Sequence, residues 1–474
     1  MTARGAPEAA WGSWIESRVP TRLDALGWSR WHRRVIVALG ITWILDGLEA
    51  SVLANLGPVL KDPRTLGLTG AGIGLASAVY LCGQVVGALG FGHLTDRLGR
   101  KRLFLVTLGL YLAATALSGL APSFWVFLPL RFAAGAGIGG EYSAINSAID
   151  ELVPARIRGR IDLAINGSYW IGVGLGAVMT LIVLDPAIFA IRIGWRVAFG
   201  LGATLGLAIL LIRRHVPESP RWLLAHGYVS EAEATVTAIE AEVGAPSEPP
   251  PAVRVHVTGP VGWRHLLHTL VHRYPRRTVL GLVLMVSQAF LYNSIFFSYA
   301  LILDRFYGVG DPSLYIVPFA VGNFLGPLLL GPLFDRIGRR TMIPLTYALS
   351  GILLLGTAAL FYGGYLNAVT QTIAWSTVFF VASAAASSAY LTVSELFPVE
   401  LRGMAIAVFY AVGTLAGAGA PLLFGAIVDT GSPVRLVAGY ALAATLMIGA
   451  AIVARALAVP AEGKSLEHLT ADDE

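Results

Sequence analysis

The chain has 474 residues, of which 55% are hydrophobic and only 13% are charged, whereas soluble globular proteins have roughly 25% charged residues. The mean hydropathy of +0.68 leaves too few charged side chains to cover a soluble surface. These values exclude an ordinary soluble domain and indicate that lipid is the solvent for most of the chain.

A bilayer-spanning helix needs about 20 apolar residues, and the chain contains many long stretches without Asp, Glu, Lys or Arg. We therefore predict an all-α membrane protein with twelve transmembrane helices in two six-helix pseudo-repeats. The predicted helices lie near residues 35–58, 72–94, 103–120, 123–149, 161–184, 195–213, 278–303, 313–334, 341–362, 371–394, 403–428 and 434–456.

The basic residues are unevenly distributed among the loops. With the N-terminus inside the cell, only six of the 34 Lys and Arg residues lie outside and Arg131 lies in the membrane. This positive-inside bias predicts that both termini are cytoplasmic, and it argues against nucleic acid as the reason for the net charge of +5. An excess of Arg over Lys is expected of a GC-rich bacterial genome, so we place this multi-pass protein in a bacterial cytoplasmic (plasma) membrane.

The longest polar stretch divides six predicted helices from six. We expect a cytoplasmic and partly disordered N-terminal tail, two helical bundles, a solvated cytoplasmic linker with a short helix at 229–243, and a cytoplasmic C-terminal tail. Their ranges are 1–34 for the tail, 35–213 and 278–456 for the bundles, 214–277 for the linker and 457–474 for the C-terminal tail.

The two halves repeat a charged loop motif. Gly92-x-x-x-Asp96-Arg97-x-Gly-Arg100 precedes the third predicted helix, and a matching loop of the second half contains Asp335, Arg336 and Arg339. A Glu-x6-Arg pattern follows the fourth and tenth helices, where Glu151 with Arg158 and Glu395 with Arg402 can link neighbouring helix ends. We interpret these residues as a cytoplasmic gate; the alternative is loop charge that only sets topology. The candidate gate residues are Gly92, Asp96, Arg97, Arg100, Glu151, Arg158, Asp335, Arg336, Arg339, Glu395 and Arg402.

These loops resemble the signature of the major facilitator superfamily. Pro217-Glu-Ser-Pro-Arg221-Trp-Leu after the sixth helix, Arg131-x-x-x-Gly135-x-Gly137, and Gly463-Lys-Ser-Leu-Glu resemble marks of its sugar-porter branch. The resemblance covers roughly residues 35–470. It implies a secondary transporter that works by alternating access, without a cofactor and without enzymatic activity.

Four charged residues lie inside predicted helices, where each costs about 2.5–3.5 kcal/mol to insert. They are Asp46, Glu49, Arg131 and Glu141. Glu49 stands where proton-coupled sugar porters carry a carboxylate in their first helix, and Arg131 stands where they carry an arginine. The resemblance thus implies that these residues couple transport to protons. A static ion pair that aids packing is the alternative, and Glu141 could equally be a structural charge.

Polar and aromatic side chains on other helices are candidates for substrate binding. Amides suit hydroxyl-rich solutes because they both donate and accept hydrogen bonds, and aromatic rings add contact surface. Gln288 and Asn293 match part of the sugar-porter motif of the seventh helix, and Asn166 stands near a sugar-binding position of that family. The alternative for each is hydrogen bonding between helices. The candidates are Asn166, Tyr169, Trp170, Gln288, Tyr292, Asn293 and Tyr390.

The sequence departs from sugar porters in places that bear on the substrate. The tenth helix has Ala386-Ser-Ser-Ala-Tyr390 where that family has Gly-Pro-x-x-Trp, and Asp46-Gly-Leu-Glu49 is similar to the Asp-Gly-x-Asp of aromatic-acid/proton symporters. Gly135-x-Gly137-x-x-Gly140 formally matches a dinucleotide motif, but inside an apolar helix it indicates close packing.

The predicted function is proton symport of a small polar solute, a sugar or an organic acid, by a protein that works as a monomer. The alternatives are a proton-coupled exporter, a passive facilitator, and a membrane sensor without transport. We find no nucleophile–base set and no metal-ligand cluster in the sequence.

Overall fold

The computed structural model describes residues 7–68, 70–185, 187–213, 218–244, 250–258, 262–296, 298–309, 313–398 and 401–464. The side chains of Asp96, Arg97 and Arg100 lie outside the described part, so these three gate predictions stay predictions.

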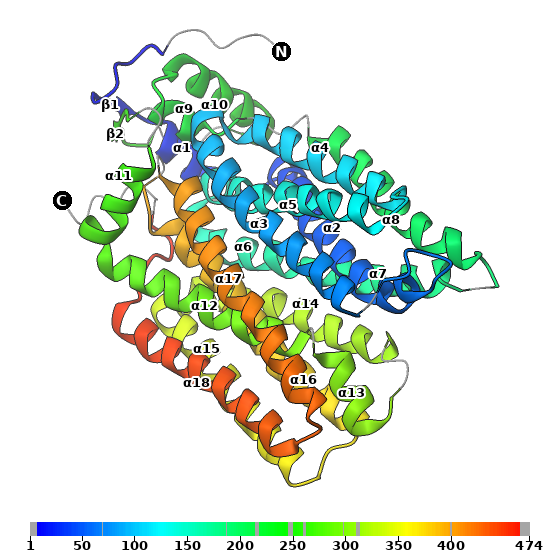
Figure 1. Cartoon of the computed structure of the whole chain (residues 1–474). Helices are drawn as coiled ribbons and strands as arrows, with labels where there is room; N and C mark the ends of the chain where they lie inside the picture. The colour runs from blue at the N-terminus through cyan, green and yellow to red at the C-terminus, as the bar shows by residue number, and fades with distance from the viewer. Residues whose placement is uncertain are drawn as a thin grey trace.

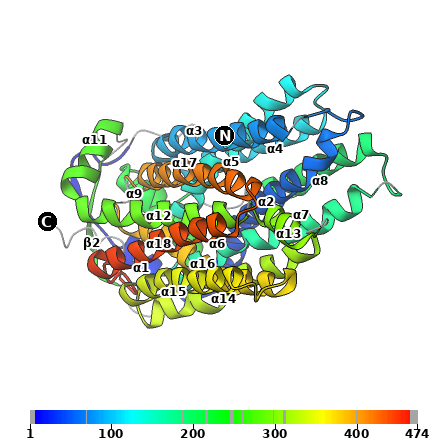
Figure 2. The same ribbon diagram turned by 60° about the horizontal axis from the view of Figure 1, so that its bottom comes forward.

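Long helices run side by side through most of the molecule (Figures 1 and 2). The first half consists of α2 (Arg30–Lys61), α3 (Gly70–Leu98), α4 (Arg100–Gly119), α5 (Phe124–Leu152), α6 (Arg158–Gly167), α7 (Tyr169–Val183) and α8 (Ile191–Arg213). The second half consists of α12 (Pro275–Phe296), α13 (Tyr299–Tyr307), α14 (Ser313–Arg336), α15 (Arg339–Tyr362), α16 (Ala368–Glu395), α17 (Arg402–Asp429) and α18 (Pro433–Leu457). Within the described residues, ten candidate spans are long and apolar enough to cross a membrane.

Each of the twelve predicted helix ranges falls on helical structure, but the fifth and seventh ranges are interrupted. The range 161–184 divides into α6 and α7 at Ser168, whose hydroxyl donates to the carbonyls of Ile165 (2.6 Å) and Gly40 (3.1 Å). Between α12 and α13, the Ser298 hydroxyl likewise donates to the carbonyl of Ser294. Hydrogen bonds from serine side chains to backbone carbonyls compete with the helical hydrogen bonds and bend helices. The length of an apolar run does not reveal such interruptions.

Helices α3 and α5 pack closely because glycines face the partner's backbone. A Cβ atom at Gly87 would lie 2.6 Å from the carbonyl carbon of Ala136, and one at Gly135 would overlap the carbonyl group of Tyr80. Gly135 belongs to the stretch with the dinucleotide-like pattern, so the packing interpretation of this glycine is confirmed.

The N-terminal segment and the segment between the two halves gather at one end of the bundle, which we call the terminal end (Figure 1). Strand β1 (Trp14–Ser17) pairs antiparallel with β2 (Val253–His256), and beside them lie α1 (Val19–Ala25), α9 (Pro220–Ala225), α10 (Val229–Val243) and α11 (Trp263–His268). The prediction of a helix at 229–243 is confirmed by α10. Within the tail for which partial disorder is predicted, residues 14–25 form β1 and α1, and an apolar side of α1, including Val19 and Leu23, is buried against the neighbouring helices.

The packing of α3 on α5 can be tested with two alanine substitutions on α3. Gly87→Ala forces a Cβ into the Ala136 backbone, and overpacking of this kind costs about 1–3 kcal/mol. Gly90→Ala is the matched control, because a Cβ there meets nothing within 4 Å and alanine favours helix over glycine by about 1 kcal/mol. In thermal-melting measurements on purified protein, we expect Gly87→Ala to melt several degrees below wild type and Gly90→Ala to melt at or above it. Equal melting temperatures for the two variants would contradict this packing.

Candidate functional site

A buried ion pair joins α2 to the first third of α5. The Arg131 Nη1 donates to Glu49 Oε1 at 2.6 Å, and the hydroxyl of Thr115 on α4 donates to Glu49 Oε2 at 3.0 Å. Glu49 is 2% exposed and Arg131 is fully buried. Three helices of the first half therefore meet at one carboxylate. The expected proximity of Glu49 and Arg131 is present, and the contact from Thr115 on α4 adds to it.

Asp46 lies one turn before Glu49 and is held by phenol groups. The hydroxyl of Tyr80 on α3 donates to Asp46 at 3.2 Å, and the hydroxyl of Tyr142 on α5 donates to its other oxygen. The Arg131 guanidinium lies 4.8 Å from the centre of the Tyr80 ring, a distance at which cation–π attraction operates. Tyr80 thus connects the environment of Asp46 to that of the Glu49–Arg131 pair.

Glu141 is also buried, at 2% exposed, but it lies ten residues beyond Arg131 on α5. At about 1.5 Å per residue, this places the Glu141 backbone roughly 15 Å along the helix axis toward the terminal end. The prediction that Glu141 takes part in proton coupling stays a prediction.

An aromatic cluster from both halves lies beside Asp46. Trp43 on α2 and Tyr142 on α5 belong to the first half, while Tyr390 on α16 and Tyr410 on α17 belong to the second. The rings of Tyr142 and Tyr410 stack with centroids 4.3 Å apart, and the Trp43 ring lies 4.5 Å from Tyr142 and 5.7 Å from Tyr390. We call these four residues the central aromatic cluster. Because Tyr142 also binds Asp46, this cluster links a buried carboxylate to the second half.

A second aromatic contact joins the halves through Trp170 on α7. Its ring lies 5.8 Å from that of Tyr292 on α12 and 5.5 Å from that of Phe319 on α14. Tyr169 packs edge-on against Trp170 at 5.4 Å, and the Tyr292 hydroxyl donates to Asn323 at 3.0 Å. The structure therefore brings three of the predicted substrate residues together at the interface between the halves.

Two of the predicted amides donate to the backbone of their own helices, and Asn166 of α6 also donates to Asn146 of α5 at 3.5 Å. Asn166 donates to the carbonyl of Asp162 at 2.9 Å and Asn293 donates to that of Ala289 at 2.8 Å. Gln288 is buried and its amide lies 3.9 Å from the sulfur of Met285. Their assignment to substrate binding is not tested by these contacts.

At the terminal end, the charged residues of the two halves form crossed ion pairs. Arg158 at the start of α6 pairs with Glu395 at the end of α16 at 3.6 Å, and Arg402 at the start of α17 pairs with Glu151 at the end of α5 at 3.5 Å. All four side chains are no more than 1% exposed. The sequence suggested pairs within each half, whereas each of these two ion pairs joins one half to the other.

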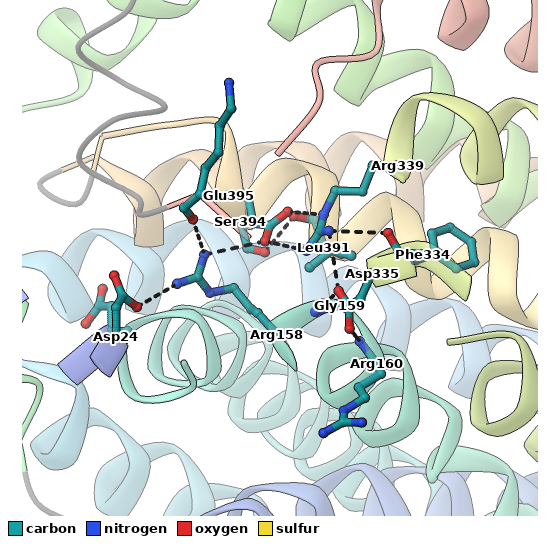
Figure 3. A network of polar contacts seen from close by, with 12 residues as sticks. Asp24, Arg158, Gly159, Arg160, Phe334, Asp335, Arg339, Leu391, Ser394 and Glu395 are labelled. Carbon is teal, nitrogen blue, oxygen red and sulfur yellow. Dashed lines mark hydrogen bonds and ion pairs between the residues drawn. The ribbon is translucent and has the colours of Figure 1, made fainter. Parts of the chain in front are cut away.

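Further contacts extend this network (Figure 3). The Arg339 guanidinium donates to both oxygens of Glu395, at 2.6 and 2.8 Å, and Asp335 accepts from the backbone N–H groups of Gly159 and Arg160 at 3.1 and 2.9 Å. Arg336 is exposed, and Gly92 is buried in α3. Six predicted gate residues are therefore brought together, and Arg336 lies at the surface.

Sequence reasoning missed several residues of these sites. Tyr142 carries a readable signal, because it follows Arg131 by about three helical turns and so lies on the same face. Tyr80 and Tyr410 carry no such signal, since their contacts depend on how helices distant in sequence pack. Arg221 lies in a motif that the sequence analysis used only for resemblance, and its partner Asp24 lies in the segment assigned to a disordered tail. Among the described residues, no group of three or more His, Cys, Asp or Glu is arranged to hold a metal ion.

The chain is similar to known transporters over most of its length. It is 26% identical over 409 residues to the niacin transporter NiaP of Acinetobacter baylyi, covering 85% of this chain and 89% of that one. It is 28% identical over 378 residues to a probable 4-methylmuconolactone transporter of Cupriavidus pinatubonensis, covering 80% and 79%.

Among solved structures, the proton:xylose symporter XylE bound to 6-bromo-6-deoxy-D-glucose matches with a TM-score of 0.76 at 21% identity, covering 94% of this chain and 99% of that one. A partially occluded inward open conformation of XylE from E. coli matches with a TM-score of 0.65 at 20% identity, covering 89% and 98%. The sequence profile of the family named "Sugar (and other) transporter" matches residues 59–472. The chain therefore belongs to this family of the major facilitator superfamily, whose members are transporters and not enzymes.

Proposed function

We propose that this protein is a secondary active transporter that moves a small polar solute, a sugar or an organic acid, together with a proton by alternating access. The observation that carries the proposal is the set of buried charges on α2 and α5 beside an aromatic cluster shared by the two halves. A charge inside a membrane-spanning bundle is costly unless it meets a partner or water, and such residues mark ion and proton pathways.

The Glu49–Arg131 pair supports proton coupling because protonation would remove one of its two charges. A neutral Glu49 no longer attracts Arg131, so the packing of α2 against α5 would differ between the protonated and ionised states. Asp46 sits one turn away and contacts Tyr142, whose ring stacks on Tyr410 of the second half. A change at the carboxylates would therefore reach the interface between the halves.

The chemistry of the central interface supports a compact organic solute with a flat or ring-shaped face. Aromatic rings offer apolar faces, and their hydroxyl groups together with neighbouring amides offer donors and acceptors. The names of similar proteins refer to niacin, 4-methylmuconolactone and myo-inositol, which agrees with a ring-shaped metabolite. In this proposal the chain crosses the membrane twelve times, has both termini in the cytoplasm, and works as a monomer in a bacterial cytoplasmic membrane.

Uptake into proteoliposomes tests the function directly. A panel of sugars, polyols and carboxylates, including nicotinate, would be offered with and without an inward proton gradient. We expect one chemical class to accumulate, and only with the gradient. Equilibration of a substrate without gradient-driven accumulation would indicate a passive facilitator, and stimulation of efflux alone would indicate an exporter.

The topology predicts which loops face the cytoplasm. In a Cys82→Ala background, which removes the single native cysteine, we expect Ala234→Cys on α10 to react with a membrane-impermeant maleimide only from the cytoplasmic side. Tyr365→Cys, at an exposed position between α15 and α16, should react only from the outside. Three predicted spans, 278–303, 313–334 and 341–362, separate the two positions, so labelling of both from the same side would contradict this topology.

Substitution of Glu49 separates coupling from transport. Glutamine keeps the shape and hydrogen-bonding capacity but cannot ionise, so we expect Glu49→Gln to abolish accumulation driven by a pH gradient while sparing substrate counterflow. Counterflow requires reorientation with solute bound but no net proton release. Because Arg131 would then be buried without its anionic partner, the amount of folded protein must be measured first.

Asp46→Asn is the matched comparison on the same helix face. If Asp46 acts through Tyr142 and the central aromatic cluster, its substitution should raise the substrate KM and slow accumulation and counterflow together. Loss of accumulation with counterflow intact in Asp46→Asn, and wild-type accumulation in Glu49→Gln, would instead assign the proton to Asp46.

A further inference from the structure

The N-terminal segment is built into the terminal end of the first half. Strand β1 pairs with β2, and α1 buries Val19 and Leu23 in a core that also contains Trp222 of α9 and Val236 of α10. Arg22 donates to Glu240 on α10 at 2.8 Å, and this hydrogen bond raises the pKa of the Arg22 guanidinium above its ordinary value. The segment is therefore fixed to the first half at several points.

This placement brings Asp24, the next-to-last residue of α1, to two buried guanidiniums. Its Oδ2 lies 2.7 Å from Arg221 Nη2, and its Oδ1 lies 3.6 Å from Arg158 Nη2. Arg221 also donates to the backbone carbonyls of Pro20 at 3.3 Å and Glu151 at 3.4 Å. The side chains of Arg158 and Arg221 are no more than 1% exposed, whereas that of Asp24 is 16% exposed.

Arg158 lies between carboxylates that belong to different sides of the gate. Its guanidinium is 3.6 Å from Asp24 on the first-half side and 3.6 Å from Glu395 of the second half (Figure 3). Both distances exceed the 2.7–2.9 Å of a tight charged hydrogen bond, so the cation is shared between the two anions. When the halves separate at this end, Glu395 moves away with α16 while Asp24 stays with the first half.

We propose that Asp24 is a positioning residue of the gate. It compensates the positive charge of Arg158 when Glu395 moves away, and so lowers the free-energy cost of opening the terminal end. This role rests on the proposed alternating access. Breaking a buried ion pair on one side is strongly destabilising because it leaves an uncompensated charge. Asp24 lowers that cost for the open state, in which Arg158 keeps a partner on its own side.

The test measures opening directly, without substrate or a proton gradient. Ser394, next to Glu395, is fully buried in the closed gate, so Ser394→Cys in the Cys82→Ala background reports opening by its rate of reaction with a hydrophilic maleimide applied from the cytoplasmic side. When Asp24→Asn is added, we expect the cysteine at position 394 to react roughly tenfold more slowly than with Asp24 present, because the open state then contains a poorly compensated Arg158. Asp24→Glu retains the charge and should label at close to the wild-type rate.

Glu233→Gln is the control for a merely structural role. It removes a carboxylate that pairs with Arg22, so it weakens docking of the same segment without touching Arg158, and it should label like wild type. Melting temperatures of all variants are measured alongside. If Asp24 had only a structural role, Asp24→Asn and Glu233→Gln would both melt at lower temperatures, and their labelling rates would not differ as predicted.

Unchanged or faster labelling in Asp24→Asn would overturn the proposal. If Asp24 only held the gate closed, its substitution would make opening easier. A slow rate in Asp24→Asn that persists in an Arg158→Gln background would also overturn it, because the effect must pass through Arg158. If Ser394→Cys never reacts in the otherwise wild-type chain, the terminal end does not open, and alternating access fails together with the role of Asp24.

Discussion

The compensation of buried charge is the constraint on which this structure depends. Among the described residues, arginines at both the middle and the terminal end of the bundle are almost completely inaccessible, including Arg131, Arg158, Arg339 and Arg402. Each has a carboxylate within ion-pair distance. Arg131 and Arg339 each pair within their own half, whereas Arg158 and Arg402 pair with carboxylates of the other half. The same physical requirement thus stabilises each bundle internally and holds the two bundles together.

The crossed pairs give the terminal end two properties at once. Ion pairs between the halves favour the closed arrangement, but desolvated charges are stabilised only while their partners stay close. A gate made of apolar contacts would lose buried area gradually as it opened. A gate made of shared ion pairs requires each charge to find a new partner, so the groups that remain on each side decide how readily it opens.

The helical fold and the charges inside it could be predicted because long apolar runs, and charges within them, are visible in the local sequence. The pairing of Glu49 with Arg131 was implied by the resemblance to sugar porters. The sequence also identified most gate residues, because the loop motifs recur in both halves. It could not predict the exchange of gate partners, since Glu151–Arg158 and Glu395–Arg402 are the neighbours along the chain and only packing of the halves sets the crossed arrangement. The aromatic partners Trp43 and Tyr410 were missed because aromatic residues are common in membrane helices. The contacts of the N-terminal segment were not predicted because its apolar residues are few and its partners are distant in the chain, 197 residues for Asp24–Arg221 and 218 for Arg22–Glu240.

That separation in the chain has a consequence for biosynthesis. Trp14 in β1 is opposite His256 in β2, so the strand on which α1 and Asp24 depend has no partner until the first six predicted helices have been made. At about 5–20 residues per second, the ribosome needs on the order of ten seconds or more to reach the second strand. The β1–β2 pairing can therefore form only after the first bundle has been made, and Arg158 is made before α9 and α10, the helices against which α1 packs. Assembly of the terminal end is therefore a late step of folding, completed only after the central linker has left the ribosome.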